Sequence, residues 1–340
     1  MHRSLRNILK NGCYTALSRS GLTALHRSSI RSELIVLTYH SFYKADAPAP
    51  IDRQNIDLLR RQVRHLMEAY TIVPLEEGLA EVLSAQPVSQ RKRPRLAITI
   101  DDGYADTYQL AYPLLRSFGV PATVFVTTDF IDTGRPPWTI RLREILRRTR
   151  RTTTRWPKCL DLSNLRSRAA AEATLMALWA DLEPEERFES LRRFDRELEV
   201  SDQTLCAGLS WDHLREMARC GFGIGSHTVF HSILTRIDHQ SLVMELSKSR
   251  ERLEAELGCE CRIVAYPNGE VSSAVAKAAG DAGYVYGLTQ RLEAICYGSD
   301  ALALGRVQVP HDEGMAVFAS RVSLLAASIA RLRLYAPFAS

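Results

Sequence analysis

Residues 96 to 103 read Leu-Ala-Ile-Thr-Ile-Asp-Asp-Gly, an apolar run that stops at two adjacent acids. A short run rich in β-branched residues predicts a buried strand, typical of a parallel sheet. Because side chains alternate along a strand, Asp101 and Asp102 should point in different directions. One of them could bind a metal while the other acts as a base. Alternatively, one aspartate caps the following helix and the other lies in a solvated turn.

The rest of the chain repeats the same strand-then-helix order. Apolar runs near residues 34–38, 71–73, 121–126, 222–225, 262–266, 284–288 and 303–309 predict further strands, and amphipathic stretches lie between them. Strand, helix and strand joined by short links imply parallel pairing. Six to eight such repeats predict an α/β fold with a closed or nearly closed barrel, whose active site lies at the carboxyl ends of the strands.

The pattern becomes helical from about residue 131 to residue 210, which predicts a helical insertion in the barrel. Its first part is strongly basic, with Glu144 as its single acid: Arg135, Arg141, Arg143, Arg147, Arg148, Arg150, Arg151, Arg155 and Lys158. Such a run is usually a solvated face, and the alternative is a seat for an anionic substrate group or a lipid phosphate.

Charge is concentrated at the start of the chain. The formal net charge is +5, and residues 1–32 form a basic N-terminal arm with six Lys or Arg and no acid, so the remainder is nearly neutral. A nearly neutral body argues against nucleic acid as a partner. The arm could contact an anionic membrane surface through an amphipathic helix, or pack on the domain.

Other features bear on the compartment. No apolar run approaches the roughly 20 residues that span a bilayer, and the arm lacks the continuous apolar segment of a secretory signal. The seven cysteines are scattered, which predicts neither a disulfide framework nor a structural zinc site. We expect a cytoplasmic protein, with membrane association at the inner face as an option. No sequence feature indicates the oligomeric state.

A second motif, His227-Thr-Val-Phe-His231, also follows a predicted strand. Two histidines four residues apart lie on one face if this is the first turn of a helix, although such pairs are common on surface helices. With Asp102 they would supply a carboxylate and two imidazoles, a set suited to Zn²⁺ that leaves positions open for water and substrate. Asp101 would then be placed to deprotonate that water.

The double aspartate followed by the double histidine resembles the first two motifs of the polysaccharide deacetylases, the NodB-homology family or carbohydrate esterase family 4. The resemblance extends in pattern from about Leu34 to Val309. It implies a distorted (β/α)7 barrel, a divalent metal, and hydrolysis of N-acetyl groups on amino sugars. It makes Asp101 the base and Asp102, His227 and His231 the metal ligands.

The third family motif is only partly present, as Ala265-Tyr-Pro-Asn268. Ala265 stands where the family has an arginine that orients the base, and Arg262 is a loose candidate to replace it. The backbone N–H of Asn268 could still donate to an oxyanion. The family's late histidine, a general acid, has a candidate match in His311. The expected substrate rim comprises His40, Tyr104, Tyr266 and Pro267.

These observations predict three segments: the arm at 1–32, a deacetylase barrel at 33–312 with its insertion at about 131–210, and a C-terminal helix at 313–340. The expected activity is metal-dependent removal of an N-acetyl or other N-acyl group from an amino sugar in a polysaccharide, oligosaccharide or lipid-linked glycan. One alternative is a catalytically silent glycan-binding relative, in view of the missing arginine. Another is a non-haem Fe(II) oxygenase, which also uses two histidines and a carboxylate.

Overall fold

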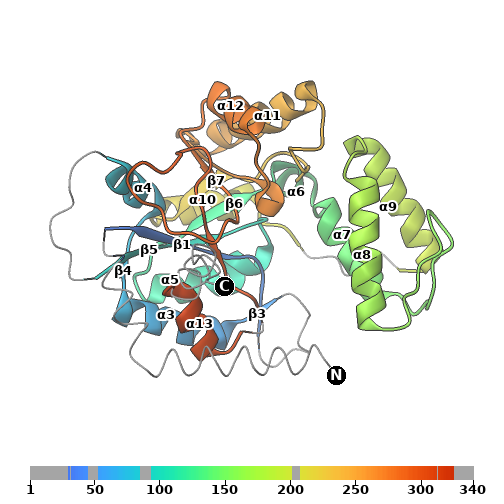
Figure 1. The fold of residues 1–340 in the computed structure, drawn as a ribbon, viewed down its shortest axis with the longest axis horizontal. Helices are drawn as coiled ribbons and strands as arrows, with labels where there is room; N and C mark the ends of the chain where they lie inside the picture. The colour runs from blue at the N-terminus through green and yellow to red at the C-terminus, as the bar shows by residue number, and fades with distance from the viewer. Residues whose placement is uncertain are drawn as a thin grey trace, which may run out of the picture.

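A curled parallel sheet forms the centre of the protein (Figure 1). The computed structural model describes residues 30, 32–44, 53–84, 93–200, 207–311 and 313–324. Neighbouring strands follow the order β10-β1-β5-β6-β7-β8-β9, and β4 pairs with β5. The strands are β1 (Leu34–Tyr39), β4 (Thr71–Ile72), β5 (Arg95–Ile100), β6 (Thr123–Val126), β7 (Gly223–Ser226), β8 (Ile263–Ala265), β9 (Tyr286–Leu288) and β10 (Val307–Gln308). The short strands β2 (Phe42–Tyr43) and β3 (Gln54–Asn55) pair separately.

Helices follow most strands and cover the outside of the sheet (Figure 1). They are α3 (Ile56–Ala69), α4 (Leu75–Leu83), a π-helix (Thr107–Ala111), α5 (Tyr112–Ser117), α6 (Thr128–Thr133), α7 (Trp138–Arg148), α8 (Leu165–Trp179), α9 (Pro184–Leu198), α10 (Trp211–Arg219), α11 (His239–Leu257), a 3₁₀ turn (Pro267–Gly269), α12 (Ser273–Asp281) and α13 (Met315–Val322). The predicted α/β fold is confirmed.

Strand β5 lies between β1 and β6, and all six of its residues are buried. Leu96, Ile98 and Ile100 join the cluster that includes α3 and α5 residues, so they face the helices. Ala97 instead packs with β1, β6, β8 and β9 residues in a second cluster, on the inside of the curled sheet. Because side chains alternate, Thr99 and then Asp101 continue this inner row.

Helices α7 to α9 lie to one side of the sheet (Figure 1). They come between β6 and β7 in sequence, although these two strands are neighbours in the sheet. Their buried apolar side chains form a separate cluster around Trp138, Trp179 and Phe194. Asn164 begins α8 with a capping box, because its side chain accepts from the N–H of Ser167. We call α7 to α9 the helical insertion below.

Several predicted elements differ locally from the structure. The amphipathic stretch between β5 and β6 is a π-helix followed by α5. Helix α13 ends at Val322, and residues 325–340 of the predicted C-terminal helix lie outside the described residues. The basic arm, apart from residues 30 and 32, lies outside them as well. Within the described ranges, no helix has both the length and the apolar character to cross a membrane.

Candidate metal centre

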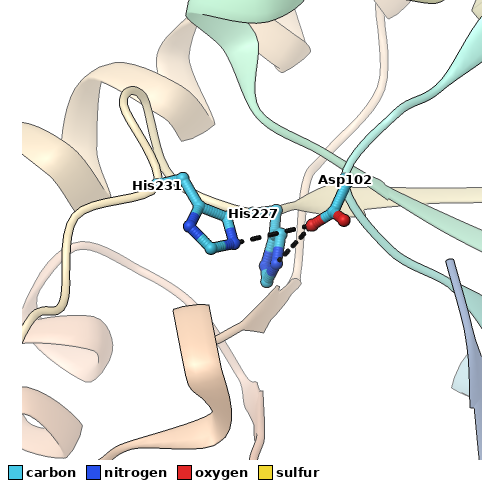
Figure 2. Close-up of side chains that lie close together, drawn as sticks. All are labelled: Asp102, His227 and His231. Carbon is cyan, nitrogen blue, oxygen red and sulfur yellow. Dashed lines mark ion pairs between the residues drawn. The ribbon is translucent and has the colours of Figure 1, made fainter. Parts of the chain in front are cut away.

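Asp102, His227 and His231 meet at the carboxyl edge of the sheet, as Figure 2 shows. Asp102 follows β5, and both histidines follow β7. Oδ1 of Asp102 lies 3.4 Å from Nε2 of His227 and 3.5 Å from Nε2 of His231. All three side chains are buried. This is the cluster in the described part of the chain with three groups able to hold a metal ion.

The three ligands are brought together by loops with unusual backbone geometry. Asp102 has φ 78° and Gly103 has φ 87°, so the chain turns sharply where β5 ends. Thr228 and His231 also have positive φ, of 67° and 57°. Residues 227–231 therefore form an irregular loop, so the histidines do not meet through a helical first turn, the condition under which their spacing would place them on one face. Non-glycine residues in this region are strained and need support from their surroundings.

The two imidazoles are held differently. Nδ1 of His227 lies 2.7 Å from the carbonyl oxygen of Ala265, which can only accept, so Nδ1 donates and Nε2 is the nitrogen that faces Asp102. Nδ1 of His231 is buried, and no described residue forms a hydrogen bond with it. Burial lowers the pKa of His231, which keeps that imidazole neutral and able to act as a ligand.

A carboxylate oxygen and two imidazole nitrogens are a donor set that a divalent metal such as zinc accepts, and the three ligand atoms lie within 4.8 Å of one another. Two ligand atoms bonded at about 2.0–2.1 Å to a tetrahedral Zn²⁺ lie about 3.3–3.4 Å apart. The Asp102–His227 and Asp102–His231 separations of 3.4 and 3.5 Å match that spacing. Three protein ligands leave a fourth position for water or substrate, the arrangement typical of a catalytic zinc site.

Asp101, the neighbour of Asp102 in the sequence, lies outside this cluster in the interior of the curled sheet, and its charge acts on His227. Its two carboxylate oxygens each accept a 2.8 Å hydrogen bond from the guanidinium of Arg306, which precedes β10. Both side chains are 0% exposed. Arg306 also donates to the hydroxyl of Thr99 and the carbonyl of Thr289. The guanidinium is thus fixed on three partners and holds Asp101 in one orientation.

The ion pair keeps Asp101 charged despite its burial. Burial raises the pKa of this carboxyl, but the charge and hydrogen bonds of Arg306 outweigh that effect, so its pKa is lowered. Burial likewise opposes ionisation of Asp102, and the adjacent imidazoles of His227 and His231 reverse this, placing its pKa well below the usual value. Both acids are therefore carboxylates at neutral pH.

Arg306 was missed by the sequence analysis, and the suggested Arg262 is wrong. Arg262 instead pairs with Glu76, and both side chains are more than 40% exposed. A signal for Arg306 was present in the sequence, because it lies within the apolar stretch at 303–309 that was predicted as the last strand. A lone arginine in a buried strand requires an acid partner.

Asp102, His227 and His231, called the metal cluster below, line a cavity of about 750 Å³. Four of the other predicted site residues line it: His40, Tyr104, Asn268 and His311. Tyr266 and Pro267 do not belong to its lining, which corrects their assignment to the rim. Tyr266 is buried and donates from its hydroxyl to the carbonyl of Leu302, so its ring belongs to the interior of the sheet.

The helical insertion forms one wall of this cavity through residues of α7 and α8, including Thr139, Arg143, Arg147 and Glu172. Several basic side chains of the predicted arginine run form ion pairs: Arg135–Asp129, Arg141–Asp195, Arg143–Glu172, Arg148–Glu144 and Arg151–Glu199. Arg141–Asp195 and Arg143–Glu172 join α7 to α9 and α8, and Arg151–Glu199 joins the segments that follow α7 and α9. The run therefore contributes to the packing of the insertion itself.

Asp106 supports the part of the cavity wall that is formed by Ser41 and Arg53. Its carboxylate accepts hydrogen bonds from the hydroxyl of Ser41, at 2.5 Å, and from the N–H of Phe42, at 3.0 Å. Arg53 lies 3.7 Å away. Burial, with a smaller contribution from the charge of Asp102, raises the pKa of Asp106 to about 6. Ser41 and Arg53 line the cavity. The carboxyl of Asp106, which contacts both, therefore titrates directly behind the cavity wall.

Comparisons with known proteins agree with this geometry. The family description of the polysaccharide deacetylases matches residues 89–287, more than half of the chain. The Bacillus subtilis protein YxkH, named as a candidate polysaccharide deacetylase, is 22% identical over 281 residues, which cover 82% of this chain and 72% of that protein.

Solved structures share the fold. The Streptococcus pyogenes deacetylase PplD, in complex with acetate, has a TM-score of 0.58 and 18% identity, over 85% of this chain and 98% of that chain. IcaB from Ammonifex degensii has a TM-score of 0.56 and 18% identity, over 86% of this chain and 97% of that chain. At these identities the likeness establishes the barrel fold, and no individual side-chain role.

Replacing Arg306 by alanine should destabilise the protein by about 3–5 kcal/mol, because Asp101 would remain buried without a compensating charge. The matched control is Arg262→Ala, which removes an exposed ion pair and should cost about 0–1 kcal/mol. Urea denaturation of both variants measures the difference. Equal losses of stability in the two variants would show that the buried Asp101–Arg306 pair contributes no more to the free energy of unfolding than the exposed pair does.

The raised pKa of Asp106 predicts a pH dependence of stability. Between about pH 4 and pH 7 the folded carboxyl retains a proton that the unfolded one has released, so the free energy of unfolding falls as pH rises. With a pKa of about 6 the total loss is about 1–3 kcal/mol. Asp106→Asn should lack this loss in urea denaturation of metal-free protein across that pH range. Parallel pH profiles for the two proteins would contradict the assignment.

Proposed function

The chain belongs to the polysaccharide deacetylase family, and we propose that it is a metal-dependent hydrolase that removes the acetyl group from an N-acetylated amino sugar. The observation that carries the proposal is that Asp101, which Arg306 holds in one orientation, directly precedes Asp102 of the Asp102–His227–His231 cluster and acts electrostatically on His227. An ion pair with a purely structural role would need no metal site beside it, and a purely structural metal site would need no second carboxylate. Together they supply a fixed carboxylate next to a site for a Lewis acid, as amide hydrolysis requires.

Asp102, His227 and His231 would hold the ion, with Zn²⁺ as the proposed metal. A bound Zn²⁺ would polarise the acetyl carbonyl and lower the pKa of a water ligand from 15.7 toward about 7. The tautomer of His227 supports this assignment, since the Ala265 carbonyl fixes its proton on Nδ1 and leaves Nε2 to act as the ligand.

Asp101 is the proposed general base. Its lowered pKa keeps it ionised and ready to accept a proton, although a carboxylate of low pKa is a weak base. It can therefore deprotonate only a water that is already acidified, which explains why the carboxylate and the metal ligands need to be neighbours. The bidentate contact with Arg306 fixes the direction in which the carboxylate can accept the proton.

Two further groups of the cavity are proposed to complete the reaction. The backbone N–H of Asn268 would donate to the tetrahedral oxyanion, a role that needs no particular side chain. His311 would protonate the leaving amine, and His40 would contact the substrate near it. All three residues line the cavity. The products would be acetate and an amino sugar that gains a positive charge.

The substrate is proposed to be an N-acetylated glycan or glycolipid. The cavity holds room for a sugar between the sheet edge and the helical insertion. That the Streptococcus pyogenes deacetylase is described in complex with acetate supports an acetyl product for this fold. The alternative of a catalytically silent sugar-binding relative loses its main support, because Arg306 supplies the charge partner of Asp101 that the altered third motif lacks.

Asp101→Asn should strongly lower turnover and leave the metal in place. Loss of a general base costs about 10²- to 10⁴-fold, whereas Asp102, His227 and His231 remain available as ligands. Acetate release from a panel of N-acetylated glycans and lipid-linked sugars, with bound zinc measured in parallel, tests this. Asp132→Asn, a surface acid paired with Arg252, is the control and should behave as wild type.

His231→Ala in the same assay should lose both zinc and activity, as should wild type treated with a chelator. A silent sugar-binding protein would show no acetate release in any of these samples. The proposed mechanism would be excluded if chelator-treated wild type and Asp101→Asn both released acetate as fast as untreated wild type.

We also propose that the basic arm at 1–32 places the protein on an anionic membrane surface, at the cytoplasmic face. The support is its charge of six Lys or Arg without an acid, each of which contributes about 1 kcal/mol near such a surface. Removing the arm should weaken sedimentation with vesicles that contain anionic lipid, and should not change binding to neutral vesicles. Unchanged binding to the anionic vesicles would refute the arm's role.

A further inference from the structure

The loop that carries both histidines is braced from several elements. The N–H groups of Thr128 and Asp129, at the start of α6, donate to the carbonyls of Thr228 and Val229, each at 3.1 Å. From α11, the buried carboxylate of Glu245 accepts from the N–H groups of Val229 and Phe230, at 2.7 and 2.9 Å. These contacts fix residues 228–230, the middle of the loop.

The end of the loop is held by the helical insertion instead. The indole N–H of Trp138, in α7, donates to the carbonyl of His231 at 3.2 Å. The guanidinium of Arg187, in α9, donates to the hydroxyl of Ser232 at 3.3 Å. Ile233 belongs to the apolar cluster of the insertion, where it joins Trp138. Three consecutive residues, beginning with a candidate metal ligand, thus contact the insertion.

This bracing matters most for His231. The ring of His227 is oriented through Nδ1 by the Ala265 carbonyl, the usual way in which a protein fixes a ligating imidazole. The buried Nδ1 of His231 has no such partner among the described residues. Besides its contacts with Asp102, at 3.5 Å, and with the ring of His227, at 4.8 Å between ring centres, the direction of the His231 ring depends on its backbone, which has φ 57° and needs outside support.

Trp138 is suited to give that support because it is itself immobile. Its side chain is 1% exposed. The guanidinium of Arg187 lies 4.7 Å from the centre of the Trp138 ring. Arg187 is fixed in turn, since its nitrogens donate to the carbonyls of Trp179, Ala180 and Leu182. A rigid chain therefore runs from α9 through Arg187 and Trp138 to the backbone of His231.

We propose that Trp138 is a positioning residue for the metal centre, and that the helical insertion is needed for full metal affinity. This inference rests on the metal site of the proposed function and adds to it. Groups that orient a metal ligand typically change affinity by about 10- to 100-fold when they are removed. Because Trp138 acts on the backbone of one ligand of three, we expect the lower end of that range.

The test is the dissociation constant of Zn²⁺ from the full chain, measured by competition with a chromophoric chelator. Trp138→Phe keeps the aromatic ring and removes the indole N–H, and should weaken Zn²⁺ binding about 10-fold. Trp156→Phe is the matched control. Trp156 packs on Trp179 in the same apolar cluster, at 6.1 Å between ring centres, and should bind Zn²⁺ as wild type does.

Two more measurements separate positioning from general stability. The visible spectrum of the Co²⁺-loaded protein reports ligand geometry, and should change in Trp138→Phe but not in Trp156→Phe. Ser232→Ala removes the contact of Arg187 with the loop and leaves the packing of the insertion intact. If Trp138→Phe does not fold, Ser232→Ala is the variant that tests the contact between the insertion and the loop. It should weaken Zn²⁺ binding about 3-fold, in line with a single hydrogen bond.

The outcomes are distinct. Wild-type protein that binds no Zn²⁺ would overturn the metal site of the proposed function. Wild-type affinity in Trp138→Phe, or in Ser232→Ala where that variant replaces it, would overturn the positioning role while leaving the proposed function intact. Equal weakening in Trp138→Phe and Trp156→Phe would also overturn it, because the effect would then come from the stability of the insertion.

Discussion

The buried ion pair between Asp101 and Arg306 is the interaction around which this site is organised. Two opposite charges with no exposed surface lie inside a curled sheet, joined by two hydrogen bonds of 2.8 Å. Removing either partner would leave a charge in an apolar interior, so each requires the other. The pair joins the end of β5 to the segment before β10, and thereby fixes the carboxylate beside the metal cluster.

This pair also shows how a charge partner expected from a family motif can come from another part of the chain. The third motif has Ala265 in place of the arginine that the family resemblance implies. In the structure the guanidinium of Arg306 reaches Asp101 from the segment just before β10, a different strand of the same sheet. A parallel barrel allows this exchange, because several strands point side chains into one interior and the carboxylate requires only a fixed positive charge.

The metal cluster depends on a second constraint, the strained loop after β7. Thr228 and His231 both have positive φ, and the loop keeps this shape because α6, α11 and the helical insertion each bind part of it. The insertion therefore has two contacts with the site: it lines the cavity through α7 and α8, and it holds the backbone of His231 through Trp138. A peripheral set of helices is in this way structurally coupled to the candidate reaction centre.

The sequence by itself determined the sheet edge and the cluster on it. An apolar strand ending in two acids, and a second strand ending in two histidines, predict that Asp102, His227 and His231 meet, because parallel strands of one sheet share a carboxyl edge. Alternation along β5 further predicts that Asp101 points elsewhere. The tertiary structure decided what Asp101 points to, since Arg306 lies 205 residues away and no local pattern encodes that contact. It also decided the shape of the histidine loop, where the four-residue spacing suggested a helical turn and contacts from three distant elements impose an irregular one. Local periodicity reports which residues are buried, whereas partners across the barrel depend on how the whole sheet curls.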